Sequence, residues 1–190
     1  MPPTPEAFRR IERGEALQRI RKCKESDFEV IWQIINDGAQ AYKGVIPQDR
    51  WKEPYMSRDE LRREMRGGVE FWGFEEHGAL AGVMGIQSVK DVTLIRHAYV
   101  RTQRQRAGIG ARLLAHLRSL ASGPVLVGTW ADASWAIHFY EKHGFLVVGP
   151  EQKNTLLRRY WTVTDAQAGA SVVLVHHDAN IEKSEESMVS

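Results

Sequence analysis

The glycine pair Gly108 and Gly110 stands where a basic turn gives way to an amphipathic helix. Apolar residues recur at helical spacing in the segment 113–120, so the helix begins beside the glycines. The first turn of a helix presents unpaired backbone N–H groups and the positive end of the helix dipole. Residues without side chains let a phosphate approach these donors, and Arg104 and Arg106 add positive charge. The segment therefore predicts a site for a phosphorylated ligand.

A buried strand precedes this turn. Residues 92–100, VTLIRHAYV, are β-branched and aromatic, as is typical of a strand. The turn fits neither common nucleotide loop, because it lacks both the Gly-Lys-Ser/Thr ending and a third glycine with a downstream acidic residue. The pattern Gln/Arg-x-x-Gly-x-Gly, with Val100 five residues before Gln105, resembles the acetyl-coenzyme A signature of the GNAT acetyltransferase superfamily.

A second motif lies in residues 125–145. VLVGTW predicts a strand, Asp132 a helix N-cap, and Gly144 a left-handed stop after a helix that ends at Lys142. The ending Ala-x-x-Phe-Tyr-Glu-Lys-x-Gly-Phe is similar to the second GNAT motif, in which a tyrosine approaches the cofactor sulfur. Tyr140 occupies that position. The two motifs follow each other in the family's order and spacing, and the resemblance covers roughly residues 18–176.

The resemblance implies an α/β (α+β) fold with a mixed, mostly antiparallel sheet of about seven strands. Helices would cover both faces, and the sheet would splay between the fourth and fifth strands. The implied activity is an N-acetyltransferase that uses acetyl-coenzyme A and no metal, with Tyr140 as the general acid. The implied cofactor-binding residues, which act largely through their backbone, are Ala98, Tyr99, Val100, Gln105, Arg106, Ala107, Gly108, Ile109, Gly110 and Ala111.

The general base is harder to assign. Many relatives carry a glutamate four or six residues before the valine, where this chain has Arg96 and Leu94. Strict alternation places Leu94, Arg96, Ala98 and Val100 on one face of the strand and His97 with Tyr99 on the other. A histidine titrates in a suitable range, but His97 reaches the acceptor only if a bulge shifts the register. A packed His97, a water-relayed base or no base are alternatives.

Other residues bear on the acceptor. Arg96, if it faces the pocket, favours an acceptor with a carboxylate or phosphate. Trp51 and Tyr55 lie in the loop that borders the acceptor in relatives, and Ala133 replaces an asparagine that contacts the cofactor in many of them. The acceptor is expected to be a small-molecule or peptide amine. A non-catalytic acyl-coenzyme A sensor or partner-binding module on the same fold is the alternative function.

Composition narrows the class of protein. The chain has 190 residues, 43% hydrophobic, and a formal net charge of +2, which argues against nucleic acid as a partner. A single cysteine allows no intrachain disulfide, and adjacent His176 and His177 should point in opposite directions on a strand, so we expect no metal site. Without an apolar run of 18 residues or a signal-peptide pattern, we expect a cytoplasmic protein that does not enter the membrane. The oligomeric state is open, with a homodimer as one alternative.

The remaining elements follow from periodicity and caps. We expect an arm over residues 1–17, a domain over 18–176 and a mobile tail over 177–190. Within the domain, the expected helices begin after Glu25-Ser26-Asp27 and after Ser57, with a helical turn over 155–161. The other expected strands are 19–24, 70–75, 80–89, 145–149 and 170–176.

Overall fold

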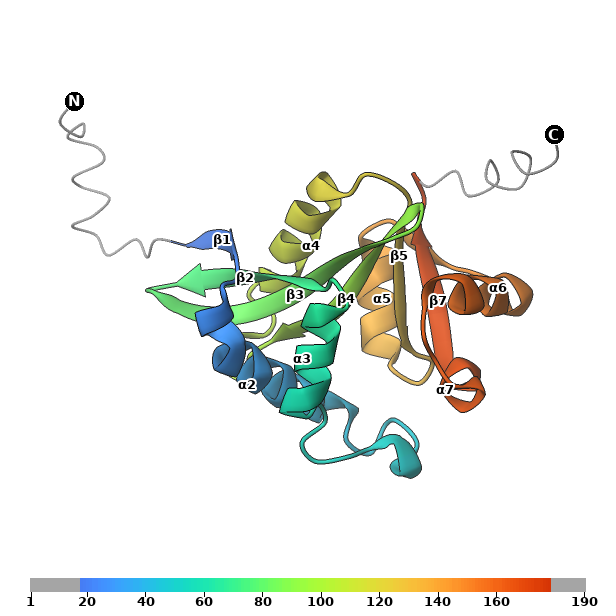
Figure 1. Cartoon of the computed structure of the whole chain (residues 1–190), viewed down its shortest axis with the longest axis horizontal. Helices are drawn as coiled ribbons and strands as arrows, with labels where there is room; N and C mark the ends of the chain where they lie inside the picture. Colours follow the sequence, from blue (N-terminus) through green and yellow to red (C-terminus); the bar gives the residue numbers. More distant parts are fainter. Residues whose placement is uncertain (1–17, 179–190) are drawn as a thin grey trace.

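The computed structural model describes residues 18–178, so the predicted arm and all but two residues of the predicted tail lie outside the described part. These residues form a seven-stranded mixed sheet with helices on both faces (Figure 1). The predicted fold class is confirmed. None of the helices between residues 18 and 178 is long and apolar enough to cross a membrane. The strands are β1 (Arg19–Lys22), β2 (Glu70–Glu76), β3 (Ala79–Val89), β4 (Val92–Val100), β5 (Val125–Trp130), β6 (Phe145–Val147) and β7 (Ser171–His176).

The strand order is β1-β2-β3-β4-β5-β7-β6, and β4 with β5 is the one parallel pair of the described sheet. This pair is short. Its register runs from Thr93 opposite Val125 to Ile95 opposite Val127, and beyond that point β4 pairs with β3 while β5 pairs with β7. The predicted splay between the fourth and fifth strands therefore opens after three residue pairs.

Two groups of helices cover the sheet. On one face α4 (Ile109–Leu120) and α5 (Ser134–Lys142) pack against Met84, Ile95 and Phe145. On the other face lie α2 (Phe28–Gly38) and α3 (Arg58–Arg66), packed against Phe71 and Val83, and α6 (Pro150–Tyr160), packed against Leu94 and Leu126. Figure 1 shows α4 and the pair α2 and α3 on opposite sides of the strands. We call these two sides the α4 face and the α2 face.

Local signals explain several helix ends. Ser57 accepts from the backbone of Glu60, whose carboxylate accepts from the backbone of Ser57, so the predicted N-cap of α3 is confirmed as a capping box. Gly144 has a φ of +87° and ends the helix that closes at Lys142, as predicted. The predicted N-cap at Asp132 is wrong by one residue, because Ala133 takes the cap position without a side-chain bond.

The segment between β6 and β7 is more helical than predicted. Gly149 and Pro150 start α6, which reaches Tyr160 instead of forming only a turn over 155–161. Pro150 suits the first turn of a helix, where its missing N–H has no intrahelical partner. A short helix, α7 (Asp165–Gly169), was not predicted; Thr164 and Gln167 close it with a second capping box. Strands β1 and β6 each end two residues earlier than predicted.

Strand β4 contains a bulge at His97, the residue that the sequence offers as a general base. Val83 of β3 pairs with Tyr99, and Gly85 pairs with Arg96. Between these pairs a single residue of β3, Met84, lies opposite two residues of β4, His97 and Ala98. His97 has a φ of +49°, a left-handed conformation that few residues other than glycine adopt. The strict alternation predicted for this strand is therefore wrong beyond Ile95.

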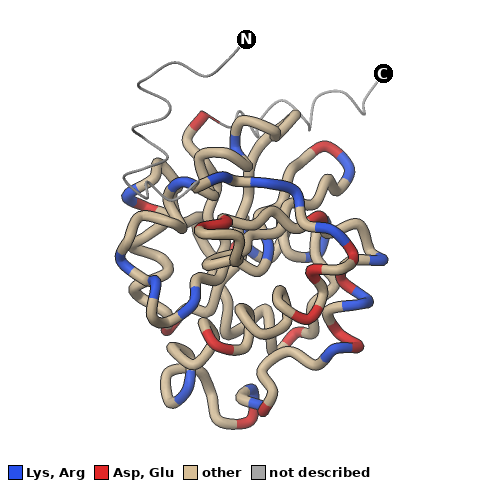
Figure 2. Tube along the Cα trace, turned by 90° about the vertical axis from the view of Figure 1, so that its left-hand side faces the viewer, with Lys and Arg blue, Asp and Glu red and all other residues tan. Residues whose placement is uncertain are grey.

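Positions of both charge signs are interspersed along the Cα trace drawn in Figure 2, in keeping with the net charge of +2. Many of them pair. The carboxylate of Glu75, for example, accepts from Arg19 and Arg21 across the edge of the sheet.

Candidate active site

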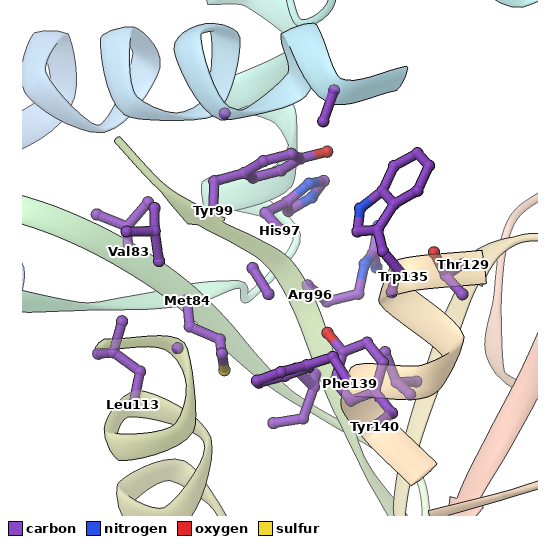
Figure 3. Close-up of a pocket in the computed structure, with 18 of the residues that line it drawn as sticks. Val83, Met84, Arg96, His97, Tyr99, Leu113, Thr129, Trp135, Phe139 and Tyr140 are labelled. Carbon is purple, nitrogen blue, oxygen red and sulfur yellow. The ribbon is translucent and has the colours of Figure 1, made fainter. Parts of the chain in front are cut away.

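A cavity of about 870 Å³ occupies the gap where β4 and β5 diverge. Figure 3 shows its interior, with β4 crossing the view and α5 on one side. It passes through the sheet, since its wall includes the first turn of α4 on one face and Trp161, which ends α6, on the other. All but one of the predicted site residues line it, and the exception is Ala107. Those that line it are Arg96, His97, Ala98, Tyr99, Val100, Gln105, Arg106, Gly108, Ile109, Gly110, Ala111 and Tyr140.

The α4 end of the cavity has the geometry that the glycine pattern predicts. Gly108 is the N-cap of α4, with a φ of +75°, and no atom lies within 4 Å of where its Cβ would stand. The amides of Ile109, Gly110 and Ala111 form the first turn of the helix, where backbone N–H groups have no intrahelical acceptor. These donors and the helix dipole suit a phosphate group.

Three basic side chains line the cavity near this turn, and one of them is already paired with a carboxylate. Arg106, with a φ of +64°, and Lys142 both line the cavity. Arg104 also lines it but pairs with Glu76, so part of the predicted positive charge is already balanced. Gln105 donates through Nε2 to the carbonyl oxygen of Val100 at 3.3 Å and ties the turn to the end of β4.

The inner edge of β4 faces the cavity. Pairing with β5 ends at Ile95, so the backbone of residues 96–100 on that side borders the gap rather than another strand. The side chains of Ala98 and Val100 pack on the α4 face, and Tyr99 packs on the α2 face. An extended ligand chain could therefore pair with the backbone here, as a further strand would.

Tyr140 lies in the opposite wall, on α5, with 5% of its surface exposed. Its ring packs edge-on against Phe139 at 5.1 Å and Phe145 at 5.5 Å between ring centroids. Figure 3 shows its hydroxyl pointing into the cavity. Burial raises the pKa of this phenol well above its usual range, with a smaller contribution from Tyr42, so the hydroxyl keeps its proton at any physiological pH.

The bulge brings Arg96 and His97 to the same carboxylate, that of Glu64 on α3. Oε2 of Glu64 accepts from Nη2 of Arg96 at 2.7 Å and lies 3.1 Å from Nε2 of His97. Arg96 also donates through Nη1 to Gln87 at 2.8 Å. Burial raises the pKa of Glu64, but the hydrogen bond from His97 and the charges of His97 and Arg96 outweigh it and leave the pKa lowered. The carboxylate is therefore ionised at neutral pH.

His97 is held from three sides. Its backbone sits in the bulge, its Nε2 meets Glu64, and its ring stacks on Phe71 with 5.9 Å between centroids and 26° between planes. The sequence analysis required a bulge in this strand for His97 to reach the acceptor. The structure contains that bulge. Sequence reasoning missed Glu64, because a glutamate in the charged helix RDELRREM carries no local sign of its partner 33 residues away.

Aromatic rings form much of the cavity wall on the α2 face. Tyr42 and Tyr55 stack at 5.8 Å, and Nε1 of Trp130 donates to the hydroxyl of Tyr55 at 2.9 Å. Of the two loop aromatics that the sequence singled out, Tyr55 lines the cavity, whereas Trp51 packs behind it at 5.7 Å. Tyr42, Trp130 and Trp161 were not predicted, because their convergence depends on three separate loops and strand ends.

His176 and His177 do not point apart as predicted, because β7 ends at His176 and the chain turns there. Their ring centroids are 4.4 Å apart, and Asp178 lies within hydrogen-bonding distance of both rings. Ligand atoms of these three residues lie within 4.8 Å of one another. Nδ1 of His176, however, already faces the Asp178 amide and Nη2 of Arg118 at 3.3 and 3.5 Å, and a cation there would meet the arginine charge.

Comparison with known proteins decides the family. The family description "Acetyltransferase (GNAT) domain" matches residues 35–159, which span the glycine turn before α4, both diverging strands and α5. The chain belongs to the GNAT acetyltransferase family. No curated protein matches the sequence of this GNAT protein.

Solved structures share the fold at low identity. The PaiA N-acetyltransferase from Thermoplasma acidophilum, in complex with coenzyme A, is 18% identical with a TM-score of 0.62; the match covers 84% of this chain and 98% of that one. The ribosomal-protein-alanine N-acetyltransferase from Brucella melitensis is also 18% identical, with a TM-score of 0.55, over 83% and 97% of the two chains. The N-acetylglutamate synthase from Neisseria gonorrhoeae, in complex with coenzyme A and N-acetyl-glutamate, is 20% identical with a TM-score of 0.57, over 85% of this chain and 35% of that one.

Proposed function

We propose that this GNAT protein transfers an acetyl group from acetyl-coenzyme A directly to the amine of a small molecule or peptide. The observation that carries the proposal is the cavity itself. It places a helix N-terminus suited to phosphate, a free strand edge and the buried Tyr140 hydroxyl around one continuous cavity. The presence of coenzyme A in two of the similar structures supports the choice of cofactor.

Binding would use the backbone of the chain. The amides of Ile109 to Ala111 and the dipole of α4 would hold the pyrophosphate, with Arg106 nearby. The space beside Gly108 would admit the phosphate oxygens. The edge of β4 over Ala98 to Val100 would pair with the pantetheine arm, which leads the thioester towards Tyr140.

When bound, the cofactor supplies an acyl thioester that an amine can attack. Tyr140 then gives a proton or hydrogen bond to the departing thiolate sulfur. Because burial keeps the phenol protonated, it enters the reaction as a donor and never as a base. The surrounding ring contacts with Phe139 and Phe145 fix its direction.

His97 would accept the proton that the amine loses. The ionised Glu64 takes the Nε2–H of His97, which leaves Nδ1 as the free acceptor of the imidazole. In this role Glu64 holds the tautomer and stabilises the imidazolium while it exists, and His97 replaces the strand glutamate that many relatives use. The arrangement favours catalysis over a non-catalytic acyl-coenzyme A sensor.

Two measurements on the same protein test the proposal. Acetyl-coenzyme A at millimolar concentration should raise the melting temperature, because a ligand that binds only the folded state stabilises it. Thiol release from acetyl-coenzyme A should then depend on an added amine. A melting temperature that does not move while a control GNAT enzyme responds would refute cofactor binding. A shift without thiol release over a broad amine panel would identify a sensor instead.

A further inference from the structure

The cavity wall on the α2 face is open to the acceptor, since the phosphate-binding turn occupies the α4 face. We call this part the acceptor wall and define it by six residues of the cavity lining. They are Tyr42, Tyr55, Arg96, His97, Trp130 and Trp161. Four of these six are aromatic, which is unusual for a site that must bind a strongly hydrated polar substrate.

No carboxylate takes part in lining the cavity. Among the described residues around it, none is Asp or Glu, while Arg104, Arg106, Lys142 and Arg96 all carry positive charge. Glu64 stands behind the wall, where Arg96 and His97 cover its oxygen. A second ammonium group on the acceptor would therefore lose its hydration without meeting a counter-charge, which is costly.

The rings present dry, uncharged surfaces. Burial raises the pKa of Tyr42 to about 12, and burial likewise raises the pKa of Tyr55, so both phenols are neutral. The Tyr55 hydroxyl accepts from Nε1 of Trp130, and the Tyr42 hydroxyl shares a hydrogen bond with Thr129. The Tyr42 ring packs against Trp135 with 5.5 Å between ring centroids. With their polar atoms engaged, these side chains offer mainly apolar and aromatic area to a ligand.

Arg96 is not free to recognise an anion by charge alone. Two of its three guanidinium nitrogens already donate, one to Glu64 and one to Gln87, and the Glu64 carboxylate balances its charge. A carboxylate on the acceptor would have to compete with this internal pair. This internal pairing weakens the argument for an anionic acceptor that the sequence favoured.

We infer that the acceptor is a monoamine with an uncharged aromatic or apolar body, and this rests on the proposed acetyl transfer. The body would lie against Tyr42, Tyr55 and Trp130, with the amine directed to the thioester. The same surroundings favour the neutral form of the amine, which is the form that attacks the thioester. A low-dielectric wall that offers the ammonium ion no carboxylate disfavours that ion, so the bound amine loses its proton more readily than in water.

Binding and turnover separate this inference from the proposed reaction. Coenzyme A-saturated protein is titrated with 2-phenylethylamine, butane-1,4-diamine and L-glutamate, and binding is followed by tryptophan fluorescence, since Trp130, Trp135 and Trp161 line the cavity. The same amines are assayed with acetyl-coenzyme A by thiol release. We expect 2-phenylethylamine to bind at least about tenfold more tightly than the other two and to show the highest kcat/KM, as expected when a hydrophobic pocket discriminates by apolar area.

Two variants report on the wall. Tyr55→Leu removes a ring and should weaken 2-phenylethylamine binding several-fold while leaving the coenzyme A affinity unchanged. Thr129→Asp adds a carboxylate to the lining and should raise kcat/KM for butane-1,4-diamine relative to 2-phenylethylamine. Thr155→Asp adds the same charge on the exposed side of α6 and serves as its control.

Each outcome decides a separate question. Tighter binding or faster acetylation of butane-1,4-diamine or L-glutamate by the unaltered protein would overturn the inference. So would a Thr129→Asp protein that binds coenzyme A normally and keeps the original preference. Binding of 2-phenylethylamine without any thiol release would refute acetyl transfer and leave the chemistry of the wall as inferred.

Discussion

Glu64 of α3 lies 3.1 Å from Nε2 of His97, the β4 residue that the bulge holds in a left-handed conformation. The same oxygen takes a hydrogen bond from Arg96 at 2.7 Å. A carboxylate therefore lies beside this strand. The strand itself carries none at the two positions where many relatives have a glutamate, which are Leu94 and Arg96 here. The Glu64 carboxylate reaches the site from a helix and through a histidine.

We expect Glu64→Gln to impair turnover without abolishing the fold. Glutamine still accepts a hydrogen bond but brings no charge, so kcat/KM should fall about tenfold or more, as is usual for a lost orienting partner. His97→Asn should cost about 10²-fold or more.

The control for this prediction is Asp59→Asn on the same helix. Its carboxylate is exposed and, within residues 18–178, forms an ion pair with Arg62 one turn away, so kcat/KM should stay unchanged. If Glu64→Gln kept the full kcat/KM, Glu64 would serve structure alone and His97 would need no orienting partner.

Tyr140→Phe should lower kcat by about 10²- to 10³-fold with little change in KM, because the hydroxyl acts when the thiolate departs. The ring contacts with Phe139 and Phe145 persist, so the melting temperature should hardly move. Tyr160→Phe is the matched control. Its hydroxyl donates to Asp91 at 2.9 Å outside the cavity, so stability should fall by about 1 kcal/mol while turnover is kept. Full activity in Tyr140→Phe would show that the phenol is a packing residue.

Gly108→Ala should weaken coenzyme A binding beyond its effect on stability. The new methyl group meets no protein atom but points into the space assigned to phosphate, while the positive φ costs about 1–2 kcal/mol of strain. Gly78→Ala provides an equal strain, because that glycine has a φ of +78° in the β2–β3 turn and also meets nothing. Calorimetry should find similar losses of stability in both variants and a loss of coenzyme A affinity only in Gly108→Ala. Equal affinities would remove the phosphate from this turn.

Alkaline titration should reveal the tyrosines as a group. Burial raises the pKa of all five, Tyr42, Tyr55, Tyr99, Tyr140 and Tyr160, whereas in the unfolded chain each titrates near its usual value of about 10. Above pH 10 the unfolded state therefore binds fewer protons, so the free energy of unfolding falls as pH rises. The slope is up to about 1.4 kcal/mol per pH unit for each fully buried phenol.

Absorbance of phenolate and circular dichroism, recorded on the same samples, check this expectation. Tyrosine ionisation should appear together with the loss of structure. A phenol that ionises near pH 10 in protein that is still folded would contradict the burial of that side chain.

Local signals made much of the fold predictable. The capping box at Ser57, the apolar spacing after Gly110 and the stop at Gly144 each involve residues within one or two turns, so their sequence neighbours determine them. The geometry of the glycine turn before α4 was predictable for the same reason, since it consists of consecutive backbone amides at one helix end. The bulge at His97 was not, because it depends on how β3 pairs with β4. Glu64 and Trp130 reach the site from elements distant in sequence, and no periodicity reports such contacts.

The position of β7 has a consequence for how the protein is made. This strand lies between β5 and β6 although it follows both along the chain, and β6 pairs with nothing else in the described sheet. During synthesis on the ribosome, strands β1 to β4 can pair as soon as they emerge, since each meets its predecessor. Phe145 of β6 packs on Tyr140, so the wall that carries Tyr140 should become ordered only when residues 171–176 have left the exit tunnel. Activity should therefore appear on the nascent chain as a single late event.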